Sequence, residues 1–326
     1  MAPIVTDVKR TPLGAAWDAT RMRLLVELDR QGSVSAAARV VGITQSTASE
    51  HLRLLEAAAG QRLIERSGRG SRLTEAGRVL AARAAQALVA LGAGEEELAE
   101  LAGLKTGTIH LGASTAPGVY LLPDTLGCFR TDYPHVRVEI EVAASDEILR
   151  RLLAGRLQLA VVGVAHADER ITLQPFLEDE IVGVARPGLL HQQNGVVEPQ
   201  ALAGAMLLAR EPGSGTQALA NQELEAAAVQ PAGVWELGSS EAIKRAARAG
   251  LGFAFLSRYA VAEETARGEL KSFRLAGRPP LKRQFMLARL AGRPLSPSEA
   301  AFVATLTRCC ASTADYAQAC LAPAVA

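Results

Sequence analysis

From residue 107 onward, short apolar runs alternate with amphipathic helical stretches, and the alternation occurs in two successive series. Apolar runs that alternate with helical patterns are typical of βα units, whose strands form a parallel sheet. The first series has strands at 107–113, 136–142 and 157–163 and helices at 121–133 and 146–153. The second has strands at 206–209, 233–237 and 252–256, a helix from Ala218 and a helix at 241–249. Each series therefore predicts a βαβαβ half.

The two halves predict a ligand-binding cleft. Segments near 182–187 and 273–283 would cross between the halves, and a strand at 284–289 with a helix at 297–309 would return to the first half. Ligands bind outside the carboxyl ends of the strands in open α/β sheets. Two such halves that face one another therefore predict a cleft between them.

The segment before residue 75 has the pattern of a helix-turn-helix. Gly32 ends a first helical run, Ser33 caps a short helix at 34–41, and Thr44 caps a third helix. The apolar stripe of that third helix consists of Ala48, Leu52, Leu55 and Ala59. Its polar side carries Gln45, Ser46, Ser49, Glu50 and Arg53. Hydroxyl, amide and guanidinium groups on one helix face can reach base edges and phosphates, so the third helix is a candidate recognition helix.

Two short strands are expected at 62–65 and 71–74, around a turn with the sequence RSGRG. Arg66, Arg69 and Arg72 would lie near its tip, where guanidinium groups can contact phosphates. In a protein that does not bind DNA, the same residues would form a solvated turn. Residues 1–74 contain eleven Lys and Arg and seven Asp and Glu, a net charge of +4, whereas the rest of the chain carries −3. The positive excess lies on the segment that would meet DNA.

Segment 32–77, GSVSAAARVVGITQSTASEHLRLLEAAAGQRLIERSGRGSRLTEAG, resembles the winged helix-turn-helix of the LysR-type transcriptional regulators. The match includes the Gly-Ser and Ala-Ala of the second helix, the Thr-Gln that opens the third, and the Leu-Glu and Gly that follow. The resemblance implies that the polar residues of the third helix meet bases and backbone and that the arginines form the wing. The predicted DNA-binding set is Ser33, Ser35, Gln45, Ser46, Ser49, Arg53, Arg66, Arg69 and Arg72.

Three features depart from the usual pattern of that family. Ser46-Thr47 stands where Pro-Ala is usual, Ile64-Glu65 replaces a Phe and a variable residue, and about twenty residues precede the first helix. The first departure leaves the base specificity open. The last suggests a flexible arm or a leader.

Residues 75–101 predict a long helix with a heptad stripe. The stripe, in which steps of four and three residues alternate, consists of Leu80, Ala84, Ala87, Leu91, Gly94, Leu98 and Leu101. Such a stripe packs either on the chain's own core or on a second helix. The resemblance implies the second, a linker helix that pairs antiparallel with its twin. It therefore implies a homodimer or a dimer of dimers on a pseudo-palindromic site in double-stranded DNA.

The remainder resembles the effector domain of the same family, an α/β domain with the periplasmic-binding-protein fold and two subdomains. "TIHLGAS", "LLAGRLQLAVVG", "REPGSGT" and "EAIKRAARAGLGFAFLSR" follow in the family's order, and the resemblance as a whole spans residues 21–308. "REPGSGT" followed by "ELGSSEAIKRA" looks most like the branch that contains regulators of carbon-fixation genes. The predicted division is an arm (1–20), a winged helix-turn-helix (21–74), a linker helix (75–103), an effector domain (104–311) and a tail (312–326). Subdomain I would comprise about 104–183 and 284–311, and subdomain II about 184–283.

Small hydroxyl residues begin the predicted helices of both halves. A helix start offers free backbone N–H groups and partial positive charge, which favour a bound anion. Ser and Thr are also ordinary N-caps that need no ligand. The candidate effector residues are Ser114, Thr115, Ser145, Ser214, Gly215, Thr216 and Ser240. They favour a small carboxylated or phosphorylated metabolite or an inorganic oxyanion over an aromatic ligand, because only Tyr120 could stack there.

Enzymatic motifs are missing from the glycine-rich segment 210–217, REPGSGTQ. It has no lysine for a phosphate-binding Walker loop. Pro212 and Thr216 occupy the positions where a Gly-x-Ser-x-Gly nucleophile motif needs glycine. An enzyme on the same two-lobed fold remains an alternative, because spatially assembled triads leave no sequence pattern. A solute-binding protein would need an export signal and would not explain the N-terminal helices.

Thiols and histidines give no sign of a metal or cofactor. The four cysteines have no CxxC spacing, and the five histidines lie far apart. A redox sensor is disfavoured because residues 186–280 contain no cysteine. No stretch of about 18 residues is free of polar groups. We therefore expect no cofactor, no metal and no membrane contact, a cytoplasmic location, and RNA polymerase as a possible further partner.

Overall fold

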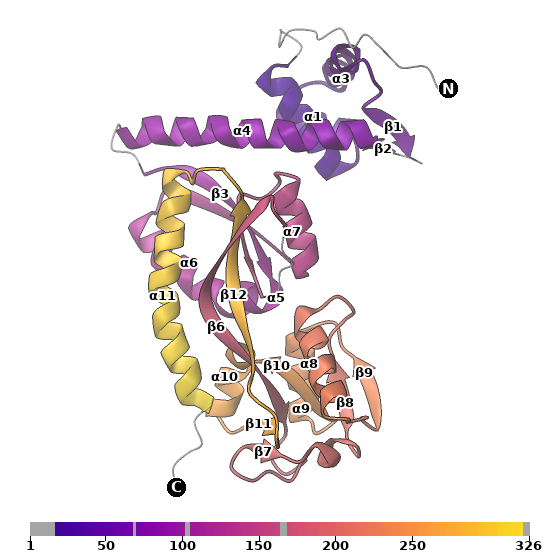
Figure 1. Cartoon of the computed structure of the whole chain (residues 1–326). Coiled ribbons are helices and arrows are strands. Elements are labelled where there is room, and N and C mark those ends of the chain that lie inside the picture. The colour runs from indigo at the N-terminus through magenta and orange to yellow at the C-terminus, as the bar shows by residue number, and fades with distance from the viewer. Residues whose placement is uncertain (1–16, 68–69, 102–104, 164–167, 322–326) are drawn as a thin grey trace. The chain divides into compact units, whose positions relative to one another are not determined.

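The computed structural model describes residues 17–67, 70–101, 105–163 and 168–321 (Figure 1). The chain forms two compact units. The first extends to Glu95 and includes 153–156, and the second comprises 96–152 and 157–326. Each unit has its own buried core. None of the described helices combines the length and the apolarity that a bilayer span requires.

The first unit is a three-helix head with a two-stranded hairpin. It contains α1 (Ala19–Gln31), α2 (Val34–Val41), α3 (Gln45–Ala59), β1 (Ile64–Ser67), β2 (Gly70–Leu73) and most of α4 (Glu75–Leu101). Side chains of Asp18, Ser33 and Thr44 accept hydrogen bonds from backbone N–H groups of the first turns and cap α1, α2 and α3. The predicted stripe residues Ala48, Leu52 and Leu55 are buried in the core of this head.

The hairpin strands lie two residues later and one residue earlier than expected. The first was predicted at 62–65 but runs over Ile64–Ser67, and the second was predicted at 71–74 but runs over Gly70–Leu73. The Glu56 carboxylate accepts hydrogen bonds from the Leu63 and Ile64 N–H groups, at 2.8 and 3.2 Å. The Glu56 side chain thus holds the start of β1 against α3, while the Leu63 carbonyl still accepts a hydrogen bond from the Thr74 N–H at 2.9 Å. A local apolar pattern does not reveal such a long-range contact.

The second unit has two lobes joined by long strands. One lobe contains β3 (Gly107–Ser114), β4 (Val136–Ala143) and β5 (Leu159–Val162), and the other β8 (Met206–Ala209), β9 (Gly233–Glu236) and β10 (Phe253–Ser257). β6 (Ile171–Ala185) and β12 (Leu281–Leu290) pair antiparallel along both lobes (Figure 1). The strand order is β4-β3-β5-β12-β6-β10-β8-β9, and β11 (Lys271–Leu275) pairs with β6 and with β7 (Val196–Val197).

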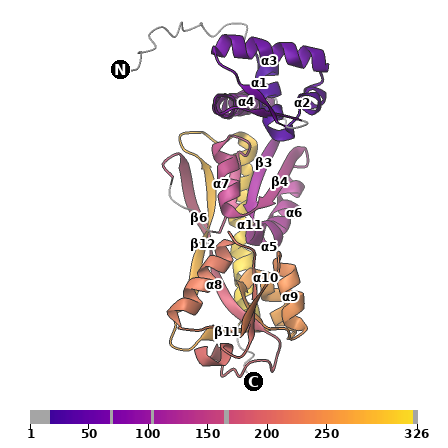
Figure 2. The same ribbon diagram turned by 90° about the vertical axis from the view of Figure 1, so that its right-hand side faces the viewer.

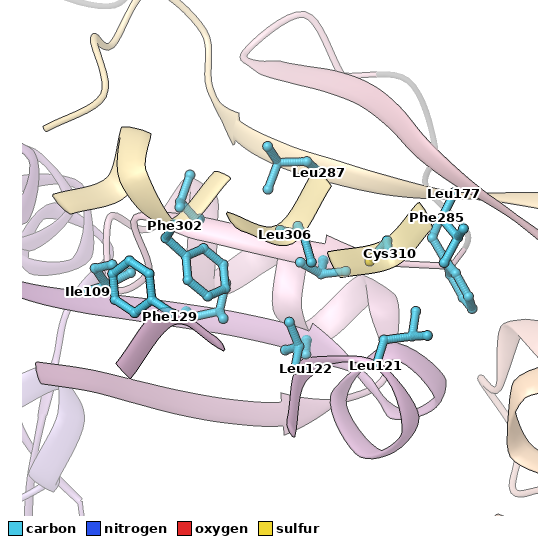
Figure 3. Close-up of a cluster of buried hydrophobic side chains, with 14 of the residues drawn as sticks. Ile109, Leu121, Leu122, Phe129, Leu177, Phe285, Leu287, Phe302, Leu306 and Cys310 are labelled. Carbon is cyan, nitrogen blue, oxygen red and sulfur yellow. The ribbon is translucent and has the colours of Figure 1, made fainter. Parts of the chain in front are cut away.

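The helices of the first lobe cover both faces of its strands. Ile109, Leu111 and Ala113 of β3 share a core with α6 (Leu122–Asp132) and α11 (Pro297–Leu321). Figure 3 shows Phe129 of α6 beside Phe302 of α11, an edge contact with ring centroids 5.4 Å apart. On the other face, Gly112 leaves room for Ile148 of α7 (Ser145–Leu153), because a Cβ would come within 2.7 Å of that side chain.

The second lobe is built by the same alternation. Phe253 and Phe255 of β10 pack with α8 (Gly215–Ala226), whereas Ala254 and Leu256 pack with α9 (Ser240–Arg248) and α10 (Arg258–Ala266). Figure 2 shows α8 and α9 on opposite sides of this lobe. A 3₁₀ turn, Pro199–Leu202, completes it. Parallel pairing of β8 with β9 and β10 confirms the βα character expected of the second series.

Two element predictions were wrong in detail, and one helix was not predicted. The helix predicted at 121–133 is α6, one residue shorter at each end, and the short helix α5 (Thr115–Tyr120) precedes it; Pro123 in the first turn of α6 lacks the N–H that would continue α5 into α6. α8 begins three residues before the predicted Ala218, where Ser214 caps it. The crossover predicted near 182–187 is the end of β6, and segment 273–283 contains two strands separated by a turn at Gly277.

Candidate functional site

A polar pocket lies between the two lobes of the second unit. Its lining comes from β3, α5 and α7 of one lobe, from the β8–α8 segment of the other, and from β5 and β12. Six of the seven predicted effector residues line it: Ser114, Thr115, Ser145, Ser214, Gly215 and Thr216. The remaining lining residues are Ala116, Ala144, Gly163, Arg210, Glu211 and Arg283. The structure thus brings together residues as far apart in sequence as Ser114 and Arg283.

These hydroxyl residues converge because of where strands end and helices begin. Ser114 is the last residue of β3, Ser145 the first of α7, and Ser214 the N-cap of α8. Parallel strands bring their carboxyl ends to one edge of the sheet. Ser214 Oγ accepts a hydrogen bond from Gln217 N–H at 3.4 Å, and Ser114 Oγ accepts one from Gly163 N–H at 3.0 Å. Capping therefore accounts for Ser214, while Ser114 ties β3 to the end of β5.

Arg210 is a buried guanidinium at the end of β8. Its Nε and Nη2 donate to the two oxygens of Glu211 at 2.8 and 2.6 Å. Nη1 donates to Ser240 Oγ at 2.9 Å, and Nη2 also donates to Thr115 Oγ1 of the other lobe at 3.4 Å. Ser240, the seventh predicted residue, is therefore bonded to a lining residue rather than lining the pocket itself. Arg210 thus joins the starts of two helices, α5 and α9.

Arg283 brings a second guanidinium to the pocket from β12. Its Nε donates to Asp179 Oδ2 at 2.7 Å, and Nη1 donates to Thr216 Oγ1 at 3.1 Å. Ser257 Oγ donates to the other oxygen of Asp179 at 2.8 Å. Burial raises the pKa of Asp179, while the Arg283 guanidinium and the Ser257 hydroxyl favour its ionised form. Arg283 is thus held in place by a fully buried acid.

Tyr120 does not line the pocket. Its hydroxyl donates to Glu241 Oε1 at 2.7 Å, and Lys244 lies 5.1 Å from its ring centroid. Burial and the bond to Glu241 raise the pKa of the Tyr120 hydroxyl. The aromatic ring that the sequence offered for stacking is therefore occupied by side chains of α9.

The two guanidinium groups were missed in the sequence, although both are central to the pocket. Arg210 opens the segment REPGSGT and so lay within the motif itself. Arg283 has no such signal, because only the register of β12 against β6 brings it opposite Asp179. Chemically, two guanidinium groups beside hydroxyls and helix starts are suited to hold a small anion. Among the described residues, no cluster of three His, Cys, Asp or Glu is placed to hold a metal.

The predicted DNA-binding residues lie on the first unit. Ser33 caps α2, and Ser35 is exposed in its first turn. Gln45, Ser46 and Ser49 are exposed on the first turns of α3, where Ser49 Oγ donates to the Gln45 carbonyl at 3.0 Å. The start of α3 therefore presents amide and hydroxyl groups to solvent.

The arginines of this surface are paired with neighbouring acids. Arg53 donates to both Glu50 oxygens, at 2.9 and 2.6 Å, and the Arg72 Nε donates to Glu65 Oε1 at 2.7 Å. Both pairs are exposed, so each is worth little in water and can be exchanged for phosphate. Arg66 lies in β1, and the structure does not describe its side chain; Arg69 lies outside the described residues.

Two family models match the chain. The bacterial regulatory helix-turn-helix protein model of the lysR family matches residues 19–78, and the LysR substrate binding domain model matches residues 102–311. The uncharacterized HTH-type transcriptional regulator YeiE of Escherichia coli K12 is 33% identical over 251 residues, 77% of this chain and 84% of YeiE. The HTH-type transcriptional regulator CbbR of Rhodospirillum rubrum is 30% identical over 287 residues, 88% of this chain and 94% of CbbR.

Solved structures have the same fold. A full-length OxyR variant from Pseudomonas aeruginosa superposes with a TM-score of 0.72 at 21% identity, covering 90% of this chain and 98% of OxyR. The regulatory domain of CcmR from Synechocystis PCC6803, in complex with 2-PG, has a TM-score of 0.56 at 30% identity and covers 62% of this chain and 96% of that domain. The chain therefore belongs to the LysR family of transcriptional regulators: it has a DNA-binding helix-turn-helix and an effector-binding α/β domain, and it is not an enzyme.

Proposed function

We propose that this regulator responds to a small anion bound in the pocket at Arg210 and Arg283. The observation that carries the proposal is the presence of two buried guanidinium groups in one hydroxyl-lined pocket, at 5% and 7% side-chain exposure. Arg283 Nη2 lies 2.7 Å from Asp179 Oδ2, but it is buried without a hydrogen-bond acceptor of suitable geometry among the described residues. A buried N–H without an acceptor favours binding of a group that supplies one.

One solved relative supports an anionic effector. The CcmR regulatory domain, 30% identical in sequence, was solved in complex with 2-PG. A carboxylated or phosphorylated metabolite of similar size, or an inorganic oxyanion, fits the lining of this pocket. The proposed contacts are the guanidinium groups together with the Ser114, Thr115, Ser145, Ser214, Gly215, Thr216 and Ser240 groups.

Titration calorimetry with 2-PG, phosphate and sulfate tests the pocket. Arg210→Gln should weaken the binding of the anion that binds wild-type protein by about tenfold or more, because charge-assisted bonds contribute roughly 1.5–3 kcal/mol. Arg274→Gln removes the same charge from β11, where Arg274 pairs with Glu180 outside the pocket, and should change affinity less than threefold. Equal losses in the two variants, or no binding of any of the three anions to wild type, would contradict the anion site.

We further propose that α3 reads a pseudo-palindromic DNA site through Gln45, Ser46, Ser49 and Arg53, with Ser33, Ser35 and the wing arginines on the backbone. Sites selected from a random duplex pool supply the DNA for the measurement. Arg53→Ala should weaken binding to a selected site by about tenfold at fixed salt. Arg23→Ala removes an exposed arginine from α1 and is the control. A loss no larger than that of the control would remove Arg53 from the interface.

Pairing of α4 would supply the second recognition helix. Leu91 and Leu98 of the heptad stripe are 58% and 69% exposed, and so leave an apolar surface for a twin helix. We propose a homodimer or dimer of dimers that acts in the cytoplasm, where RNA polymerase is a further partner. We propose one task for each part of the chain: the winged head (21–74) binds DNA, the linker (75–103) pairs with its twin, and the effector domain (104–311) binds the anion. Light scattering of wild type and Leu98→Glu measures the assembly, which the charge should weaken.

A further inference from the structure

The pocket already contains two carboxylates, one on each guanidinium. Glu211 pairs with Arg210 through two hydrogen bonds, and Asp179 pairs with Arg283. The Glu211 side chain is 36% exposed, whereas that of Asp179 is 0% exposed. The two acids therefore differ in whether they can leave their arginine.

Asp179 is fixed in place. It lies within β6, opposite Arg283 of β12, and Ser257 holds its second oxygen. No rotation takes this carboxylate to water, and separation of the buried pair would leave two unpaired charges in a low-dielectric site. Arg283 consequently keeps its partner whether or not a ligand is present.

Glu211 can leave. It follows β8 in the turn that precedes α8, next to Pro212 and Gly213, and its side chain reaches solvent. Burial alone would raise the pKa of the Glu211 carboxyl. Hydrogen bonds from Arg210 and from its own backbone N–H have the larger combined effect and hold the pKa below the usual range. At neutral pH, Glu211 is thus an anion that occupies Arg210; its half-exposed carboxylate can be hydrated when it leaves, provided that a bound anion replaces it on the buried guanidinium.

The free space in the pocket also points to Glu211. The cavity volume is about 20 Å³, which is enough for about one water molecule. An anion with more than a few heavy atoms needs a side chain to move. Rotation of Glu211 into solvent would free Nε and Nη2 of Arg210 together, while Nη1 remains on Ser240. These two N–H groups form the parallel fork that matches a carboxylate or a phosphate.

We infer that Glu211 is an internal competitor for the effector: its carboxylate occupies the anion-binding edge of Arg210 and is displaced when the ligand binds. The inference rests on the proposed anion site. The competition restricts the effector to acids. A neutral ligand would have to replace the Glu211 carboxylate on Arg210 without supplying a negative charge. The competition also favours a dianionic phosphate over a single carboxylate, since the ligand must outbind a carboxylate that is tethered beside Arg210.

Neutral variants of Glu211 test the competition in the full-length protein. Calorimetric titration with 2-PG and with sulfate should show about five- to tenfold tighter binding to Glu211→Gln than to wild type. Glu211→Ala, which also removes the hydrogen-bonding group, should bind at least as tightly. Because the Arg210 guanidinium is only 5% exposed, removal of its carboxylate partner should lower the melting temperature without ligand, so affinities are compared at a temperature where all variants are folded.

Asp146→Asn is the matched control. Asp146 is an exposed carboxylate in the first turn of α7, next to the lining residue Ser145, so its neutralisation changes the charge near the pocket equally. Its effect should stay within twofold. If Asp146→Asn increases the anion affinity as much as Glu211→Gln does, the increase comes from the general electrostatic potential near the pocket, and the competition is overturned.

The outcomes separate this inference from the anion site itself. Wild type that binds an anion through Arg210, together with unchanged or weaker binding in both Glu211 variants, overturns the competition and leaves the site intact. Failure of wild type and of all variants to bind 2-PG, phosphate or sulfate overturns the site. Tighter binding in the Glu211 variants alone supports both.

Discussion

Replacement of Asp179 by asparagine tests the buried pair on which the position of Arg283 depends. Asparagine has nearly the same shape and can still accept the hydrogen bond from Ser257, so the substitution removes chiefly the negative charge. The Arg283 guanidinium, 7% exposed, would then remain buried without an opposite charge. We expect a large loss of stability and a weaker anion site, because Arg283 loses the group that orients it.

The size of the loss follows from burial. Removal of one partner from a buried ion pair costs about 3–5 kcal/mol, and the hydrogen bonds retained by asparagine favour the lower end, about 3 kcal/mol. In a domain of about 150–250 residues, 1 kcal/mol shifts the melting temperature by about 2–4 °C. The transition of the second unit should therefore fall by about 6–12 °C in differential scanning calorimetry of the full-length protein.

The neighbouring residue provides the comparison. Glu178 pairs with Lys282 at 3.0 Å on the same two strands, but its side chain is 43% exposed and that of the lysine 55%. Glu178→Gln should cost at most about 1 kcal/mol, as exposed ion pairs do, and should shift the transition by no more than about 4 °C. If Asp179→Asn shifts the transition no further than Glu178→Gln, then the charge of Asp179 does not stabilise the fold and the reasoning fails.

Three further predictions use the same proteins. Thr216→Val removes the acceptor of Arg283 Nη1 and should abolish the effect of the bound anion on DNA affinity while ligand-free DNA affinity stays unchanged; an intact response would move the site elsewhere. Gly163→Ala places a Cβ 3.1 Å from Arg283 Nη1 and should weaken anion binding several-fold, whereas Gly127→Ala, with open space around its Cβ, should not. Burial raises the pKa of the Cys310 thiol to about 11 in the folded protein. As the pH rises from 9 to 11, the thiol therefore ionises in the unfolded chain but not in the folded one, and stability falls. Between pH 8 and 10, the free energy of unfolding measured in urea should fall by about 1 kcal/mol more for wild type than for Cys310→Ala. Equal decreases would refute the raised pKa of Cys310.

The hydroxyl lining was predictable because it depends on local chemistry. Ser114, Ser145 and Ser214 each stand where an apolar run ends and a helical pattern begins, and a βα order is enough to bring such points to one edge. The stripe of α3 was predictable for the same kind of reason, since helical periodicity alone assigns Leu52 and Leu55 to the core.

The charged pairs were not predictable in this way. Arg283 meets Asp179 only through the antiparallel register of β6 and β12, over a separation of 104 residues. The short helix α5 was not predicted, because Thr115–Tyr120 contains Pro117 and Gly118, two residues of low helix propensity. At the start of β1, the N–H groups of Leu63 and Ile64 bond the Glu56 side chain of α3, a contact that the apolar pattern does not show. In the first and third of these cases, a contact between separate elements lay outside the local pattern.

The pairing of each guanidinium has a consequence for signalling. A ligand changes the activity of a regulator only if it binds one conformation better than another. Arg210 bonds Thr115 of one lobe and Ser240 of the other, and Arg283 bonds Thr216, so an anion held by both arginines touches groups whose positions depend on the relation of the lobes. With Glu211 in place, the charge on Arg210 is already balanced and the contact to Thr115 is the long one, at 3.4 Å. Displacement of Glu211 frees Nη2, so the binding of the anion and the strength of this interlobe contact become coupled. An effector that left Glu211 in place would lack that coupling, whatever its affinity.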